Sequence, residues 1–173
     1  MKLLTIEFKA IAKDLNKLEQ KLIQLYPVFI GEDHQIDTYF HVAKGRLKLR
    51  EGSIENALIY YEREDKAGTK QSDVLLYKHH PDPSLKSILI KLQGIKVVVD
   101  KKRRIYFIGN VKFHFDTVEE LGTFVEVEAI DDSGTIGVEK LREQCNKYFS
   151  FFGLEQSDFI NGSYSDLLLA KHG

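Results

Sequence analysis

Several segments of this sequence alternate charged and apolar residues with a period of two, a pattern typical of β-strands with one polar and one apolar face. In FVEVEAI, residues 124–130, Glu126 and Glu128 share one face, and two valines take the other. Other strand-like segments repeat this arrangement. The aligned charges are seven cations and five carboxylates: Lys9, Arg46, Lys48, Arg50, Arg63, Lys101, Arg103, Glu7, Asp37, Asp116, Glu126 and Glu128. The pattern predicts a sheet with one charged face.

The like charges on this face repel one another, so the face needs a counter-charge. Arg46, Lys48 and Arg50 place three cations within five residues, and each close pair of like charges costs roughly 1 kcal/mol in water and several times more when shielded from it. An open sheet with this face in solvent is one interpretation. The other is a closed eight-stranded barrel, whose wet interior binds a strongly anionic ligand together with metal ions. A polyphosphate with Mg²⁺ or Mn²⁺ satisfies both sets of charges.

Periodicity and turn residues place helices and strands along the chain. Asp14 and Asp82 are suited to cap two helices, with Pro83 at the first position of the second and Gly94 at its end. The predicted helices are DLNKLEQKLIQLYP (14–27), DPSLKSILIKLQG (82–94) and about 135–152, and the predicted strands are 3–10, 35–42, 46–51, 57–65, 72–78, 96–108, 111–117 and 123–130. The stretch 64–73 predicts a long hairpin loop. The expected class is α+β, an antiparallel sheet with helices packed outside it.

Length and composition favour one folded domain over residues 1–173. The formal net charge of −1 argues against a nucleic-acid partner, because nucleic-acid-binding proteins usually carry a basic excess. No apolar run approaches the roughly 18 residues of a membrane span, and Glu7 and Lys9 interrupt any signal-peptide core. We therefore expect no membrane partner and a cytoplasmic location. Cys145, the only cysteine, has the helical spacing of a packed thiol.

Several motifs in order resemble the CYTH superfamily, which includes class IV adenylyl cyclases, thiamine-triphosphatases and inorganic triphosphatases. The similarity spans roughly residues 3–169, and its motifs are TIEFK, QIDTYF, GRLKLRE, LIYYERED, VDKKRRIY, VKFHFDTVEELGTFVEVE and SYSDLL. The resemblance implies a triphosphate tunnel, an eight-stranded antiparallel barrel in which cations hold phosphates and carboxylates hold a divalent metal. The family signature E-x-E-x-K falls on Thr5, Glu7 and Lys9, so Thr5 stands where the first glutamate is expected.

The resemblance also implies a set of site residues. The phosphate-binding residues would be Lys9, Lys48, Arg50, Arg63, Lys101 and Arg103. The ligands of Mg²⁺ or Mn²⁺ would be Glu7, Asp116, Glu126 and Glu128, and the catalytic group would be Glu7, Lys9, Arg63 and Asp116. Arg46 and Arg104 are less specific matches. His114 is better interpreted as a wall residue hydrogen-bonded to a neighbour than as a proton carrier.

Three functions are compatible with such a site. The first is a class IV-like adenylyl cyclase, which converts ATP to cyclic AMP and pyrophosphate. The alternatives are a triphosphatase acting on tripolyphosphate or thiamine triphosphate, and a non-catalytic nucleotide- or polyphosphate-binding module. In each the partner is a nucleoside triphosphate or another triphosphate. The segment SFFGLEQSDFINGSYSDLL (150–168) has three alternatives of its own, to close one tunnel mouth, to pack on the barrel or to form a homodimer contact.

Overall fold

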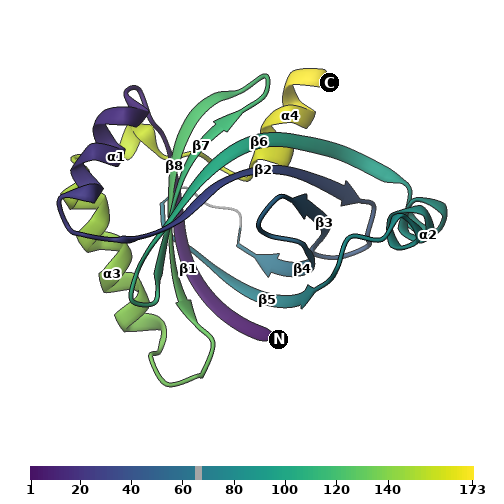
Figure 1. Cartoon of the computed structure of the whole chain (residues 1–173), viewed down its shortest axis with the longest axis horizontal. Coiled ribbons are helices and arrows are strands. Elements are labelled where there is room, and N and C mark those ends of the chain that lie inside the picture. Colours follow the sequence, from purple (N-terminus) through teal and green to yellow (C-terminus); the bar gives the residue numbers. More distant parts are fainter. Residues whose placement is uncertain (65–67) are drawn as a thin grey trace.

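Eight antiparallel strands close into a barrel in the computed structural model of this protein, which describes residues 1–64 and 68–173 (Figure 1). Around the barrel the strand order is β1-β5-β4-β3-β2-β6-β7-β8. The strands are β1 (Lys2–Ile11), β2 (Val28–Phe40), β3 (Arg46–Gly52), β4 (Ala57–Arg63), β5 (Lys70–Lys78), β6 (Ile95–Ile108), β7 (Val111–Val118) and β8 (Gly122–Asp131). The predicted α+β class and the closed eight-stranded barrel are confirmed.

Closure of the barrel turns the charged strand faces inward. On β1, Glu7 and Lys9 line the interior cavity, whereas Ile6 and Phe8 point outward and are fully buried in the main hydrophobic core. The same alternation holds on β8, whose residue Glu128 is paired in register with Glu7 of β1. The interior is therefore polar on these strands, and the core lies between their outer face and the helices.

The described residues form the helices α1 (Leu15–Ile23), α2 (Pro83–Gln93), α3 (Val138–Phe151) and α4 (Tyr164–His172), and a short 3₁₀ helix at Gln156–Asp158. Two of these helices, α1 and α3, cover the outer face of the barrel. Helices α1 and α3 lie on the same side of the barrel (Figure 1). Leu22 of α1 and Leu141 of α3 are fully buried against strand residues such as Phe113. The thiol of Cys145 donates to the carbonyl of Ile6 at 3.1 Å, which confirms a packed thiol. None of the helices in the described residues has the length and apolar character of a membrane span.

Helix α2 differs from the expectation that it covers the barrel wall. Asp82 caps it and Gly94 ends it, as predicted, but none of its residues is buried. Ile88 and Leu92 are exposed, and the helix projects at one end of the barrel beside β2 (Figure 1). Leu85, Ile88, Leu89 and Leu92 have the spacing of one apolar stripe, but the structure leaves this stripe only partly covered, with Leu85 and Leu89 half-buried.

The structure differs from the sequence-based expectation at several further points, and α1 ends at Ile23 rather than at Pro27. Strand β2 begins at Val28, and a register shift between Phe29 and Gly31 marks an irregularity in a stretch whose glycine and acidic residues have low β-propensity. Helix α4 was not predicted as a helix; Ser163 forms a capping box at its start. Strand β5 begins at Lys70, so the predicted 64–73 loop is shorter at that end, and its residues 65–67 lie outside the described part of the chain.

Candidate active site in the barrel interior

The barrel encloses a cavity of about 490 Å³, within the size range typical of ligand sites. Its lining includes all the residues predicted to bind phosphate and three of the four predicted metal ligands, Glu7, Glu126 and Glu128. Asp116 is fully buried immediately behind this lining. The alternation in the sequence thus brought the predicted residues to one place, although their roles in binding remain predictions.

The C-terminal segment covers one end of the cavity. The hydroxyl of Tyr164 donates to Asp116 at 2.7 Å, and the ammonium of Lys70 donates to the carbonyl of Gly162 at 2.8 Å. Arg46 reaches Asp166 of α4 at 2.9 Å. Of the three alternatives for this segment, these contacts support closure of a tunnel mouth, and packing on the barrel is shown as well, because Ile160 and Leu168 are buried against β6. Arg46 takes part in this closure and is not among the residues lining the cavity.

The opposite end is lined by exposed residues, among them Ile54, His80 and Pro81. Along β1, the inward side chains run from this open end to the closed end in the order Leu3, Thr5, Glu7 and Lys9. Lys9 lies at the closed end because its ammonium is 3.8 Å from the centre of the Tyr164 ring. The cavity therefore has an entrance and a deep end, and a ligand enters it in one direction.

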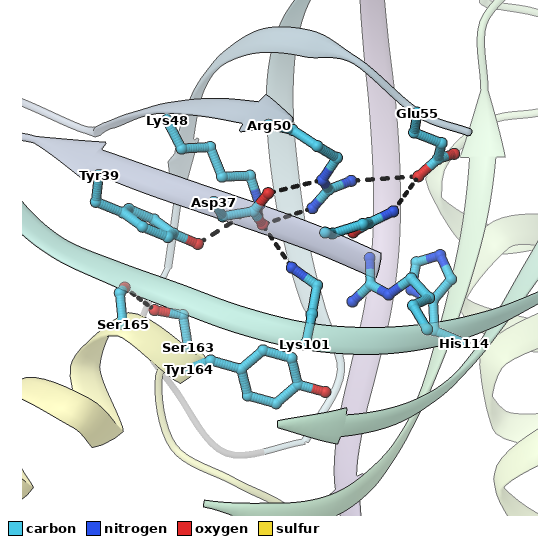
Figure 2. Close-up of polar contacts among 12 residues, drawn as sticks. Asp37, Tyr39, Lys48, Arg50, Glu55, Lys101, His114, Ser163, Tyr164 and Ser165 are labelled. Atoms are coloured by element: carbon cyan, nitrogen blue, oxygen red, sulfur yellow. Dashed lines mark hydrogen bonds and ion pairs between the residues drawn. The ribbon is translucent and has the colours of Figure 1, made fainter. Parts of the chain in front are cut away.

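Asp37 lies in contact with three of the predicted phosphate-binding cations (Figure 2). Arg50 donates to both carboxylate oxygens of Asp37, at 2.9 and 2.8 Å, and Lys101 donates to Oδ2 at 2.6 Å. Lys48 is 3.7 Å from the same oxygen. Burial opposes ionisation of Asp37, but the charges of Arg50 and Lys101 outweigh it and hold the pKa of the carboxyl well below its usual range. These cations already share one anion inside the protein.

Arg103 and Asp116 form a second buried group. Arg103 donates to both oxygens of Asp116 at 2.7 Å and reaches Glu126 at 3.4 Å. His114 lies beside them with Nδ1 3.5 Å from Glu126, and neither ring nitrogen has a hydrogen-bond partner among the described residues. Burial, followed by the charge of Arg103, lowers the pKa of His114 to about 4. His114 is thus a neutral wall residue, but it lacks the hydrogen bond that was expected.

Three carboxylates form a compact group in the deep half of the cavity. One oxygen from each of Glu7, Glu126 and Glu128 lies within 4.8 Å of the others. Burial raises the pKa of Glu7, with Glu126 adding to the effect, and burial together with Glu7 raises the pKa of Glu128 to about 7. Arg63 donates to Glu7 at 2.9 Å, and Lys9 is 3.5 Å from Glu126. Glu128 is the carboxylate with the least compensating charge.

This group fits a divalent cation. Carboxylate oxygens are the ligands that Mg²⁺ and Mn²⁺ prefer, and a cation among them would relieve the crowding that raises the pKa of Glu128. Asp116 lies in a second group, which shares Glu126 with the first and adds His114, and there Arg103 and Tyr164 already use its oxygens. The structure thus divides the predicted metal ligands into a set of three and one residue outside it.

The sequence analysis missed Glu55 and Lys112, two charged residues that line the cavity. Glu55 accepts hydrogen bonds from Arg50, Gln35 and Lys112. Glu55, Arg50 and Lys112 line the cavity, whereas Gln35 does not. Lys112 shares the strand parity of His114, so the same alternation could have identified it. Glu55 lies in the turn between β3 and β4, where period-two parity does not apply. Arg104, by contrast, points out of the barrel and pairs with Glu19 at 2.9 Å.

The raised pKa of Glu128 makes a testable prediction about stability. The folded protein holds this proton more tightly than the unfolded chain, so raising the pH from about 4.5 to 7 removes stability. A shift of this size corresponds to about 3 kcal/mol. With a chelator present, the free energy of unfolding of the wild type should fall across this window relative to Glu128→Gln, in which the group does not titrate. Denaturant unfolding at several pH values measures the difference; parallel curves for the two proteins would contradict the assignment.

Comparison with known proteins gives one family and several similar structures. The family model for the CYTH domain matches residues 3–164. PH1012 protein from Pyrococcus horikoshii is 24% identical with a TM-score of 0.78, over 94% of this chain and 98% of that one. A candidate adenylate cyclase from Vibrio parahaemolyticus is 20% identical with a TM-score of 0.78, over 95% and 97% of the two chains. HpAC1 from Hippeastrum, described with a dominant triphosphatase activity, is 13% identical with a TM-score of 0.63, over 100% and 96%. No curated protein matches this chain. At these identities the similar structures establish the fold.

Proposed function

The chain belongs to the CYTH domain family, and from this we propose that it is a metal-dependent enzyme that binds a triphosphate inside its barrel and hydrolyses the terminal phosphoryl group. The observation that carries the choice of reaction is the order of groups along the cavity. Thr5, Glu7 and Lys9 lie successively deeper than Leu3 at the open end. A substrate that enters with its phosphates first brings the terminal phosphoryl group to the carboxylates and leaves its other end toward the entrance.

Phosphate binding requires the cations to exchange partners. Arg50, Lys101 and Lys48 share Asp37, and Arg103 is bound to Asp116. Arginine holds phosphate through two parallel hydrogen bonds, whereas lysine acts as a point charge. A triphosphate carries more charge than one carboxylate, so it can draw Lys48 and Lys101 toward itself while Arg50 keeps Asp37 in place. Lys9 and Arg63 serve the terminal phosphoryl group at the deep end.

The metal belongs with Glu7, Glu126 and Glu128. In this position Mg²⁺ or Mn²⁺ would neutralise phosphate oxygens and polarise the phosphoryl group. The protein's own groups hold the substrate in line and keep it apart from bulk solvent, because Tyr164 and its neighbours cover the deep end. Phosphoryl transfer depends mainly on such positioning and charge neutralisation.

A class IV-like adenylyl cyclase is the second candidate. The motifs YYERED and VKFHFDTVEELGTF resemble the cyclase-like branch of the family, and the same cavity would then hold ATP with its α-phosphate, instead of its terminal phosphate, at the reacting position. A cyclase releases cyclic AMP and pyrophosphate, so the two reactions differ in their products.

Product identification distinguishes these functions. Tripolyphosphate, thiamine triphosphate and ATP should each be incubated with the protein over a range of Mg²⁺ and Mn²⁺ concentrations. We expect release of orthophosphate and the corresponding diphosphate. Cyclic AMP with pyrophosphate would instead establish the cyclase, and tight binding without any product would establish a non-catalytic module.

Thr5 offers a separate test of the metal group. It lies on the inner face of β1, two residues from Glu7, and is 3% exposed. Thr5→Glu would add a fourth carboxylate to the same face, so we expect the Mg²⁺ concentration for half-maximal activity to fall roughly tenfold, which corresponds to about 1.4 kcal/mol. Thr5→Gln is the control of similar size. An unchanged metal requirement in a folded Thr5→Glu protein would place the metal elsewhere.

A further inference from the structure

The cavity wall is divided into two chemically different parts. Charged side chains come from every part of the deep half, including Glu7 and Lys9 of β1 and Arg63 of β4, whereas toward the open end the inner faces of β1, β5 and β4 are apolar until Lys78 at the end of β5. This second surface, here called the apolar wall, consists of Leu3, Ala57, Ile59, Val74 and Leu76. Ile59 is paired in register with Leu76, and Leu3 with Val74, so the residues form one continuous surface across three neighbouring strands.

The proposed triphosphate does not account for this wall. A phosphate chain has no apolar surface, and the cations that β1 and β4 contribute, Lys9 and Arg63, lie deeper than the wall. Ala57 and Ile59 are buried, but Leu3, Val74 and Leu76 are only half-buried although they face the barrel interior. Burial of apolar surface is favourable, so aliphatic side chains left in contact with a water-filled cavity provide a binding surface for a ligand.

Building on the proposed function, we propose that the substrate is an organic triphosphate whose group next to the phosphates is apolar and packs on the apolar wall. The wall lies toward the entrance, beyond Thr5 and Glu7, where the part of the substrate remote from the terminal phosphoryl group remains. Its five side chains have no hydrogen-bond donors or acceptors. The nearby amide of Asn56 bonds with the backbone of Gly52 through both its oxygen and its nitrogen. The wall itself therefore selects apolar surface, and the hydrogen-bonding groups near it, Lys78 and Nε2 of His79, follow it at the outer end of β5.

A series of alkyl triphosphates tests this selection directly. Methyl, ethyl, propyl and butyl triphosphate differ only in methylene groups, and each methylene buried on the wall should tighten binding about fourfold. Calorimetry with Mg²⁺ should show a dissociation constant that falls roughly 10- to 100-fold from methyl to butyl. The change in heat capacity on binding should become more negative along the series, as expected for burial of apolar surface.

Variants on one strand provide the matched control. Leu76→Asn should remove most of the gain with chain length and leave tripolyphosphate affinity within about twofold, since the phosphate-binding residues are unchanged. Leu75→Asn is the control, because Leu75 is adjacent on β5 but points outward and is 54% exposed. Val74→Thr, which keeps the side-chain shape, serves if Leu76→Asn does not fold. Equal affinities along the alkyl series, or a gain that persists in Leu76→Asn, would overturn the proposal while tripolyphosphate still bound. Failure of the proposed function is a different result, in which no triphosphate, tripolyphosphate included, is bound or hydrolysed.

Discussion

Glu128→Gln is expected to lower the turnover of a triphosphate by a factor of roughly 100 to 1,000 and to make the metal-free protein more stable at pH 8. The two effects have one cause. Burial and the neighbouring Glu7 raise the pKa of Glu128 to about 7, so its ionised form is costly in the folded protein. Replacing it removes a cost of about 1–3 kcal/mol. The same replacement removes one of three charges that would attract the metal.

The opposite signs of these effects make the prediction specific. Turnover should be measured across a range of Mg²⁺ and Mn²⁺, and stability by denaturant unfolding with a chelator. Metal-free binding of tripolyphosphate should persist or tighten, because a negative charge has left the cavity. Glu119→Gln, at an exposed carboxylate in the turn between β7 and β8, is the control and should change neither quantity. Wild-type turnover and metal dependence in Glu128→Gln would show that this carboxylate takes no part in metal binding.

Strand parity explains how much of this site could be predicted. On β6, Arg103 faces the cavity and its neighbour Arg104 lies outside, bound to Glu19. A period of two assigns such neighbours to opposite faces with no other information. Parity cannot identify Glu55, because this residue reaches the cavity from a turn. It is also silent about Tyr164, which closes the deep end from a segment beyond the barrel.

Pairing among the inward charges could not be predicted either. From the sequence alone, the repulsion of like charges predicts that alanine at Lys48, Arg50 or Arg103 leaves the fold intact or more stable. In the structure Arg50 and Arg103 each hold a buried carboxylate with two hydrogen bonds. Removing one partner of a buried pair leaves an uncompensated charge. We now expect alanine at these two arginines to destabilise the protein. The distances that decide this arise from strand order and register, which pair Asp37 of β2 with Arg50 of β3 and Arg103 of β6 with Asp116 of β7.

Asp37→Asn is expected to destabilise the ligand-free protein by about 3–5 kcal/mol, the range found when one partner of a buried ion pair is removed. Asparagine keeps the shape of the side chain but leaves Lys48, Arg50 and Lys101 close together without their shared charge. Lys101 is 1% exposed, and burial already holds its pKa well below the usual range. Tripolyphosphate should raise the melting temperature of the variant much more than that of the wild type, because a phosphate can replace the missing carboxylate.

Two further variants separate this explanation from a general loss of packing. Asp100→Asn removes an exposed carboxylate on β6 that is paired with His34, and an exposed pair contributes at most about 1 kcal/mol. Asp37→Asn combined with Lys101→Met removes both an anion and a cation, so the double variant should be more stable than the sum of the two single effects predicts. Additive effects, together with equal stabilisation of wild type and Asp37→Asn by tripolyphosphate, would mean that Asp37 does not hold the cations for phosphate. A positive coupling that tripolyphosphate abolishes would instead identify Asp37 as the internal anion that occupies the phosphate-binding cations until the substrate replaces it.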